Sequence, residues 1–272
     1  MLEKIALDEI TKEFKACWSC AVAYVKRLGD KDLSWFKANL YSPLFEHFSF
    51  RLGNQLFFVR LEDKEGRLLV PGTLERLFTI SEACHGHALI MPMRSIGGIW
   101  LPSEPGWGLL DARTYEPVNP KNLVTTEQIP YTDWELHDMA VHTIALSLPG
   151  KKLLSFSNHP SISPSIWYEG DSGTEWVIVR YAKHPELDAV PPGNWEDVCE
   201  SCYKRSMGLG FFGVVVFAER SLATGVPTAQ KELYRGGNII YRINPLRVFR
   251  KKLPITTLSA PSKQTDDTRQ IM

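Results

Sequence analysis

Two Cys-x-x-Cys pairs are the residues in this sequence whose types and spacing most resemble a metal site. Cys17 with Cys20 and Cys199 with Cys202 could together supply the four thiolates of a tetrahedral zinc site. Each pair, however, lies inside a predicted amphipathic helix, on or near its apolar face, whereas structural zinc pairs more often lie on turns. Because buried cysteines behave as small hydrophobic residues, we expect both pairs to be packing residues.

The segment Cys84-His85-Gly86-His87 is the densest cluster of potential ligands. It could form half of a metal site, or a Cys–His nucleophile arrangement with a distant acid. No second local cluster completes such a site, and a turn that pivots on Gly86 after a short helix explains the spacing equally well. We therefore expect a structural turn at this point.

A basic run near the C-terminus could contact phosphates or stack bases. It contains Arg242, Arg247, Arg250, Lys251 and Lys252, with Tyr241 and Phe249 interleaved. Arg247, Arg250 and Lys251 are therefore the predicted binding residues if the partner is nucleic acid. The other interpretation of such a run is a solvated edge that leads into a tail.

The elements that could position a site are clearest between residues 132 and 218. Thr132 and Glu135 form a capping box, which begins a helix predicted to end at Leu148. The elements predicted to follow are strands at Lys152–Ser157, Ser165–Glu169 and Glu175–Tyr181, a helix at Trp195–Met207 and a strand at Phe211–Phe217. The fold class is therefore predicted to be α+β, with a mixed sheet and flanking helices in the C-terminal half.

This order of elements resembles the αβββαβ core of the restriction-endonuclease-like (PD-(D/E)XK) nuclease superfamily. In that family an acid at the start of the second strand and an acid-x-lysine on the third hold Mg²⁺ and activate water, often with a glutamate on the preceding helix. Strand order aligns Ser165 with the first acid. It also aligns Ile178 with the second acid and Arg180 with the lysine, while Glu135 matches the helix glutamate.

The residues at these aligned positions depart from the family pattern. Serine and isoleucine offer no carboxylate to a Mg²⁺ ion, and arginine cannot act as a general base because it stays protonated. The resemblance thus implies a catalytically degenerate nuclease fold that needs no cofactor and binds nucleic acid or a protein partner. The residues expected to line the former active-site cleft are Glu135, Ser165, Trp167 and Arg180.

Two alternatives stay open. The first is an active nuclease in which Glu135, Glu169 and Asp171 are migrated Mg²⁺ ligands and Arg180 stabilises the scissile phosphate. The second is an accessory or immunity-type protein-interaction module without catalysis. The choice between nucleic acid and protein as the partner, the oligomeric state and the question of enzyme activity are all open at this stage.

Composition limits the classes of protein further. The chain has 272 residues, of which 44% are hydrophobic and 23% charged, as in an ordinary soluble globular protein. Lysine plus arginine equals aspartate plus glutamate, 31 each, so the formal net charge is zero. This balance counts against a large, sequence-independent DNA-binding surface. With no membrane-length apolar run, no signal peptide and an odd number of cysteines, a cytoplasmic protein is expected.

The sequence also suggests how the chain is divided. Residues 1–124 are predicted to form an N-terminal α+β region, 125–252 the nuclease-like domain and 253–272 a disordered tail. The N-terminal region is expected to hold a long helix over residues 2–28, a helical segment at Leu33–Leu40, a hairpin, a short helix at Leu74–Ala83 and an aromatic-pinned loop over residues 91–121. No internal repeat is predicted.

Overall fold

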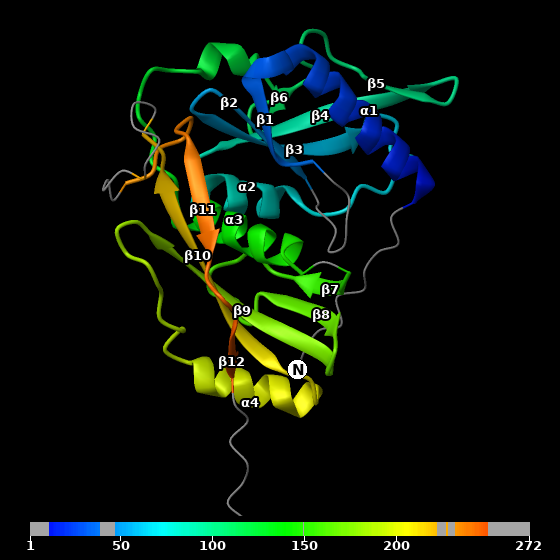
Figure 1. The fold of residues 1–272 in the computed structure, drawn as a ribbon. Helices are drawn as coiled ribbons and strands as arrows, with labels where there is room; N and C mark the ends of the chain where they lie inside the picture. The colour runs from blue at the N-terminus through cyan, green and yellow to red at the C-terminus, as the bar shows by residue number, and fades with distance from the viewer. Residues whose placement is uncertain (1–10, 39–46, 149, 222–226, 228–231, 250–272) are drawn as a thin grey trace, which may run out of the picture.

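The computed structural model describes residues 11–38, 47–148, 150–221, 227 and 232–249. These residues form an α+β protein with four α-helices and two open, mixed six-stranded sheets. Figure 1 shows the two sheets one above the other, each with helices on its faces. None of the helices in the described part of the chain is long and apolar enough to cross a membrane.

The first half of the molecule spans residues 12–111. Its elements are α1 (Lys12–Gly29), a 3₁₀ turn η1 (Asp30–Asp32), β1 (Leu33–Lys37), β2 (Phe48–Leu52), β3 (Gln55–Asp63), α2 (Leu74–Ala83), β4 (His87–Ile96), β5 (Ile99–Pro102) and β6 (Leu110–Asp111). Strands β1 to β5 lie in sequence order, and β6 also pairs with β4. The helix expected at Leu33–Leu40 is wrong over its described residues, 33–38, because Leu33 and Trp35 alternate inward on a strand that pairs with β2; residues 39 and 40 lie outside the described residues.

The second half spans residues 133–249. After a 3₁₀ turn η2 (Pro120–Leu123), its elements are α3 (Asp133–Leu146), β7 (Lys152–Phe156), β8 (Ile166–Gly170), β9 (Gly173–Lys183), α4 (Trp195–Arg205), β10 (Gly210–Glu219), β11 (Ile239–Ile243) and β12 (Arg247–Phe249). The order of helix, three strands, helix and strand is the order that the sequence predicted. Thr125, the expected domain boundary, lies between η2 and α3.

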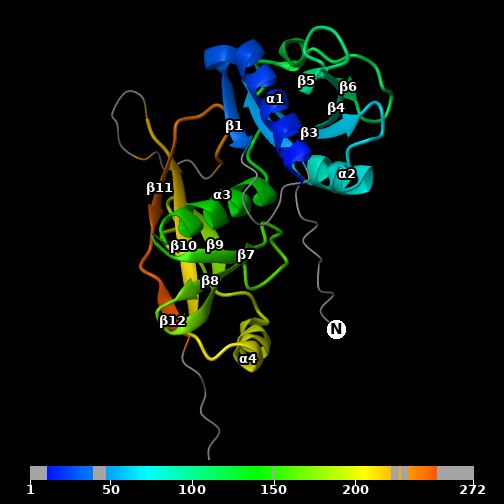
Figure 2. The same ribbon diagram turned by 90° about the vertical axis from the view of Figure 1, so that its right-hand side faces the viewer.

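The two halves have the same topology, a repeat of the fold that the sequence does not show. Each half runs helix, three antiparallel strands, helix, and a strand parallel to the third. In each half, two further strands pair antiparallel with this last strand. One of them, β5 or β11, pairs with its C-terminal part, and the other, β6 or β12, pairs with its N-terminal part. Figure 2 shows the two units stacked, with α1 at one end and α4 at the other.

The strand registers of the two halves also coincide. The pair Phe48–Val59 in the first half is equivalent to the pair Ile166–Val177 in the second. In the same way, Phe58–Ala88 is equivalent to Trp176–Gly210. The pairing of the first two strands is irregular at the same point, between residues 35 and 37 and between residues 153 and 155. Position by position, Phe50 is therefore equivalent to Tyr168 and Phe57 to Glu175.

The helices enclose each sheet on both faces. Apolar residues of α1 and α2 cover opposite faces of the upper sheet, while α3 and α4 cover opposite faces of the lower one. Because α2 and α3 lie between the sheets (Figure 1), α3 is buried on several sides and its apolar residues do not follow a single stripe. This explains why the sequence placed α3 better by its cap than by its periodicity.

The cysteine pairs lie far apart, in α1 and α4 at opposite ends of the molecule (Figure 2). Cys17, Cys199 and Cys202 are buried in the apolar cores. Burial raises the pKa of Cys17 and of Cys202 to about 12 and that of Cys199 to about 11. These thiols stay protonated at neutral pH, as packing residues do.

Candidate binding site between the two halves

The capping box at the start of α3 forms as its residue types require. The Thr132 backbone N–H donates to Glu135 Oε2 at 3.0 Å, and the Glu135 N–H donates to Thr132 Oγ1 at 3.3 Å. The Glu135 side chain is nevertheless only 1% exposed, although a capping box does not require its glutamate to be buried. A buried carboxylate requires a cationic partner, and Arg235 supplies it.

Arg235 connects the two halves through a buried ion pair. Its Nε and Nη2 donate to the two carboxylate oxygens of Glu135 at 3.0 and 2.8 Å. The same guanidinium donates to the backbone carbonyls of Cys84 and His85, which follow α2. Sequence reasoning missed Arg235, because its partner lies 100 residues earlier in the chain and no local spacing connects the two.

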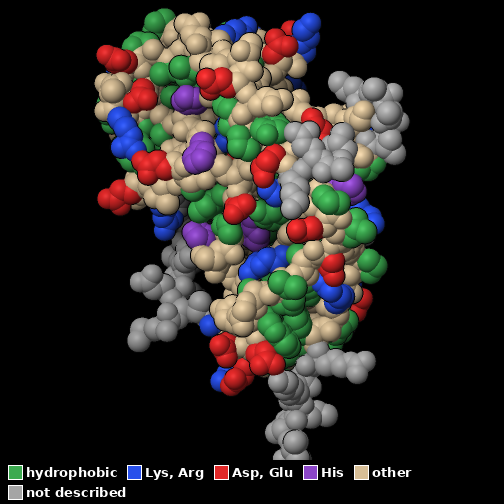
Figure 3. Space-filling model, turned by 90° about the vertical axis from the view of Figure 1, so that its left-hand side faces the viewer, with side chains coloured by type: hydrophobic (Ala, Val, Ile, Leu, Met, Phe, Trp, Pro, Cys, Tyr) green, Lys and Arg blue, Asp and Glu red, His purple; other side chains and the backbone are tan. Residues whose placement is uncertain are grey.

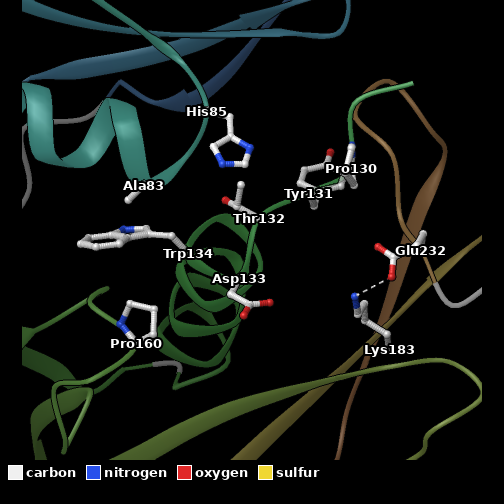
Figure 4. A pocket seen from close by; sticks show the side chains of 10 residues that line it. All are labelled: Ala83, His85, Pro130, Tyr131, Thr132, Asp133, Trp134, Pro160, Lys183 and Glu232. Carbon is white, nitrogen blue, oxygen red and sulfur yellow. Dashed lines mark hydrogen bonds and ion pairs between the residues drawn. The ribbon is translucent and has the colours of Figure 1, made fainter. Parts of the chain in front are cut away.

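A cavity of about 480 Å³ lies beside this ion pair, between α2 and the start of α3 (Figure 4). It is lined by Ala83, His85, Pro130, Tyr131, Thr132, Asp133, Trp134, Pro160, Lys183 and Glu232. Its charges are mixed, and Lys183 lies 3.5 Å from Glu232. The Trp134 indole N–H is buried and has no hydrogen-bond partner among the described residues. The arrangement can bind a polar group but holds no base and nucleophile pair.

The Cys84–His87 segment is a turn whose histidines lie in different surroundings. His85 has a φ of 44° and points into the cavity between the halves (Figure 4). His87 Nε2 lies 2.9 Å from Gln55 Oε1, and its ring stacks on Phe57. Burial, together with the charge of Arg235, lowers the pKa of His87. The segment therefore serves as a turn and contributes one side chain to the cavity.

The residues aligned with the nuclease motif are built into the sheet. Ser165 and Ile178 have no exposed surface. The Ser165 hydroxyl accepts a hydrogen bond from the Val179 N–H at 3.3 Å. Arg180 is half-buried and donates to the carbonyl of Val179 at 2.8 Å, and burial lowers its pKa. Glu135 has its ion pair with Arg235 and not with Arg180.

Trp167 is half-buried and belongs to the core between β8 and α4. Its ring centroid lies 6.5 Å from that of Trp176, in a tilted arrangement. The residue therefore packs against the sheet rather than presenting a free stacking face.

The three candidate metal ligands are not brought together. Glu169 and Asp171 lie at the β8–β9 turn, exposed, in ion pairs with Lys152 and Lys151. Asp171 lines a cavity with Ser147, just past the end of α3, whereas Glu135 is in the first turn of that helix. The helix between them rises about 18 Å. Among the described residues, no group of three or more His, Cys, Asp or Glu could hold a metal ion.

Of the predicted basic residues, Arg247 is described, whereas Arg250 and Lys251 lie outside the described residues. Arg247 makes a two-pronged ion pair with Asp188, at 2.9 and 3.0 Å, and its guanidinium lies over the ring of Phe212. This side chain holds β12 against the segment that follows β9. Its charge is already neutralised within the fold.

A comparison with protein families gives a match to the second half of the chain. A family model described as a domain of unknown function (DUF8840) matches residues 134–248, from α3 to β12. No curated protein matches the chain, and no solved structure matches it. The second half is thus similar to a family whose function is not described.

Proposed function

We propose that this protein acts by binding another protein, and that its second half is a restriction-endonuclease-like fold without catalysis. The order α3–β7–β8–β9–α4–β10 supports the resemblance. The antiparallel pairing of β7, β8 and β9 and the parallel pairing of β9 with β10 form the mixed sheet that the resemblance implies.

The absence of catalysis rests on the burial of Ser165 and Ile178. These positions align with the two acids of the family, and both have no exposed surface. A metal ion at this place would have neither carboxylate ligands nor access for water. Arg180 cannot replace the family lysine as a base, because it stays protonated.

A protein partner fits the surface better than nucleic acid does. The formal net charge is zero, and described cations such as Arg247 and Lys152 are paired with acids. Figure 3 shows positive and negative side chains interspersed over one face, without a large patch of either sign. The β4–β5 hairpin, in contrast, exposes the apolar side chains of Ile96, Ile99 and Leu101. Exposed apolar clusters of this kind are typical of protein-binding surfaces.

Two binding experiments test this proposal. In gel-shift assays at low salt, the full chain is expected to bind neither single- nor double-stranded DNA or RNA, and salt-sensitive binding would contradict a protein partner. In cross-linking from cell extract, a specific protein is expected with the wild type. Ile99→Asp should lose that protein, while Leu69→Asp, another exposed apolar position, should retain it. Equal capture by both variants would exclude the hairpin as the binding surface.

A further inference from the structure

A second cavity, of about 530 Å³, opens beside the β8–β9 turn, away from the cavity between the halves. It is lined by Ser147, Leu148, Lys151, Tyr168, Asp171, Ser172, Glu175, Leu209 and Phe211. Glu175 belongs to β9 and is only 5% exposed. A buried carboxylate next to an open cavity is unusual, because burying a charge is costly unless it has partners.

The neighbours of Glu175 form a prepared hydrogen-bonding site. The Ser172 N–H and hydroxyl both donate to Glu175 Oε1, at 3.0 and 2.6 Å, and the Tyr168 hydroxyl also bonds to this carboxylate. The Leu209 N–H donates to Ser172 Oγ at 2.9 Å, which fixes that hydroxyl. A Cβ on Gly170 would overlap Glu175 Oε2, so the glycine leaves room for the carboxylate.

The carboxylate of Glu175 is charged at neutral pH. Burial raises its pKa, but the hydrogen bonds from Ser172 and Tyr168 and the charge of Lys151 together hold it below the ordinary value. The acidic and basic side chains that line the cavity are two carboxylates, those of Glu175 and Asp171, and one lysine, Lys151. The rest of the lining includes apolar side chains, namely Leu148, Leu209 and Phe211.

The first half shows that the fold itself does not require this polar pair. Tyr168 and Glu175 are equivalent by register to Phe50 and Phe57. The two phenylalanine rings stack with their centroids 5.0 Å apart, and Phe50 also stacks on Trp107. The equivalent face of the other sheet thus accepts an apolar pair. Buried ionic groups often cost stability relative to apolar ones, so the second half keeps Glu175 for a purpose other than packing.

We infer that this cavity binds an ammonium or guanidinium group carried on a short apolar stem. Glu175 is the anionic anchor, and Tyr168 and Ser172 position its carboxylate. The stem lies against Leu148, Leu209 and Phe211. Two sources carry this chemistry, a lysine or arginine side chain of a protein partner and a free small amine. The inference does not depend on the proposed function, because a free amine would occupy the cavity without a protein partner.

Titration of the full chain with butylamine and butylguanidine, followed by NMR, tests the site directly. Both are expected to bind the wild type saturably, and neutral butanol is expected not to bind. Glu175→Gln should weaken binding at least about tenfold, because a charge-assisted hydrogen bond is lost. Glu169→Gln is the matched control and should bind as the wild type does, since Glu169 lies outside the cavity lining and pairs with Lys152. Lack of binding by the wild type, or equal binding by Glu175→Gln, would overturn the inference.

A second variant tests the comparison between the halves. The double change Tyr168→Phe with Glu175→Phe introduces the pair found in the first half. It should abolish amine binding and leave the melting temperature equal or higher. A lower melting temperature, or failure to fold, would show that the polar pair serves packing, and would overturn the inference.

Binding of a third set of ligands distinguishes the two sources of the cation. Nα-acetyl-lysine amide and Nα-acetyl-arginine amide represent side chains of a protein partner, and putrescine and agmatine represent free amines. Tighter binding of the blocked amino acids supports a partner side chain, and tighter binding of the free amines supports a small-molecule ligand. If none of the four competes with butylguanidine, the inference fails.

Discussion

Glu135 and Arg235 form an ion pair that is almost completely shielded from solvent, with both guanidinium–carboxylate bonds between 2.8 and 3.0 Å. The pair joins the first turn of α3 to the segment before β11. Through the carbonyls of Cys84 and His85, Arg235 also reaches the end of α2. A single guanidinium therefore fixes the start of α3 relative to the first half, and with it the shape of the cavity in Figure 4.

Loss of either partner of this pair should destabilise the whole chain. Glu135→Gln leaves the buried guanidinium of Arg235 without a counter-charge, and Arg235→Met leaves the buried carboxylate of Glu135 without one. Either loss typically costs about 3–5 kcal/mol. Urea unfolding measures the change in the free energy of unfolding. Lys152→Met, which removes an exposed ion pair with Glu169, is the control and should cost less than about 1 kcal/mol. Similar losses for the two kinds of variant would show that the buried pair is not a structural link.

Introduction of an aspartate at Ser165, the position that strand order aligns with the first acid of the nuclease motif, should damage the fold instead of creating a nuclease. Ser165→Asp places a carboxylate where no surface is exposed, so the melting temperature should fall sharply. Ser165→Ala removes the acceptor of the buried Val179 N–H and should cost about 1–3 kcal/mol. A stable Ser165→Asp variant that cleaves nucleic acid with Mg²⁺ would contradict this account.

Stability should fall on mild acidification because of His137. Burial, with the nearby charge of Arg180, lowers the pKa of His137 to about 4 from an ordinary 6.5. Between these values the unfolded chain binds a proton that the folded chain does not, so stability is full above pH 6.5 and is lost as the pH falls towards 4. The loss attributable to this residue is about 3 kcal/mol. Urea unfolding at pH 7 and pH 4.5 should show a smaller difference for His137→Leu than for the wild type, and equal differences would count against the assignment.

The cysteines should behave as core residues and not as zinc ligands. In the folded protein the thiols of Cys17, Cys199 and Cys202 should react slowly with a disulfide reagent, because they are buried and their pKa values are raised. Half-buried Cys20 should react first. Unfolding should expose all five thiols. Treatment with a chelator should leave the melting temperature unchanged, and a chelator-induced decrease would point to a bound metal.

The sequence predicted the parts of the fold that local chemistry decides. The capping box placed the start of α3, and the apolar runs placed β9 and β10. The strand β1 was missed because the segment is short, and its inward alternation of Leu33 and Trp35 becomes clear only when its partner strand is known.

The repeat and the two cavities depend on contacts between distant residues. Equivalent positions such as Phe57 and Glu175 differ in chemistry, so the repeat exists in strand pairing and not in residue identity. The ion pair between Glu135 and Arg235 could not be predicted from the spacing of residues in the sequence either, since 100 residues separate the two. The buried state of Ser165 and Ile178 likewise follows from the sheet, although their types alone already indicated that neither could supply a carboxylate to a metal ion.

The most direct test of the central claim is a cleavage assay. The full chain is incubated with single- and double-stranded DNA and RNA in the presence of Mg²⁺ or Mn²⁺, beside the Glu169→Gln and Asp171→Asn variants. Both altered side chains are exposed, so the variants should fold. The account predicts no metal-dependent cleavage by any of the three proteins. Cleavage by the wild type that either variant abolishes would contradict it and would identify a working metal site at the β8–β9 turn.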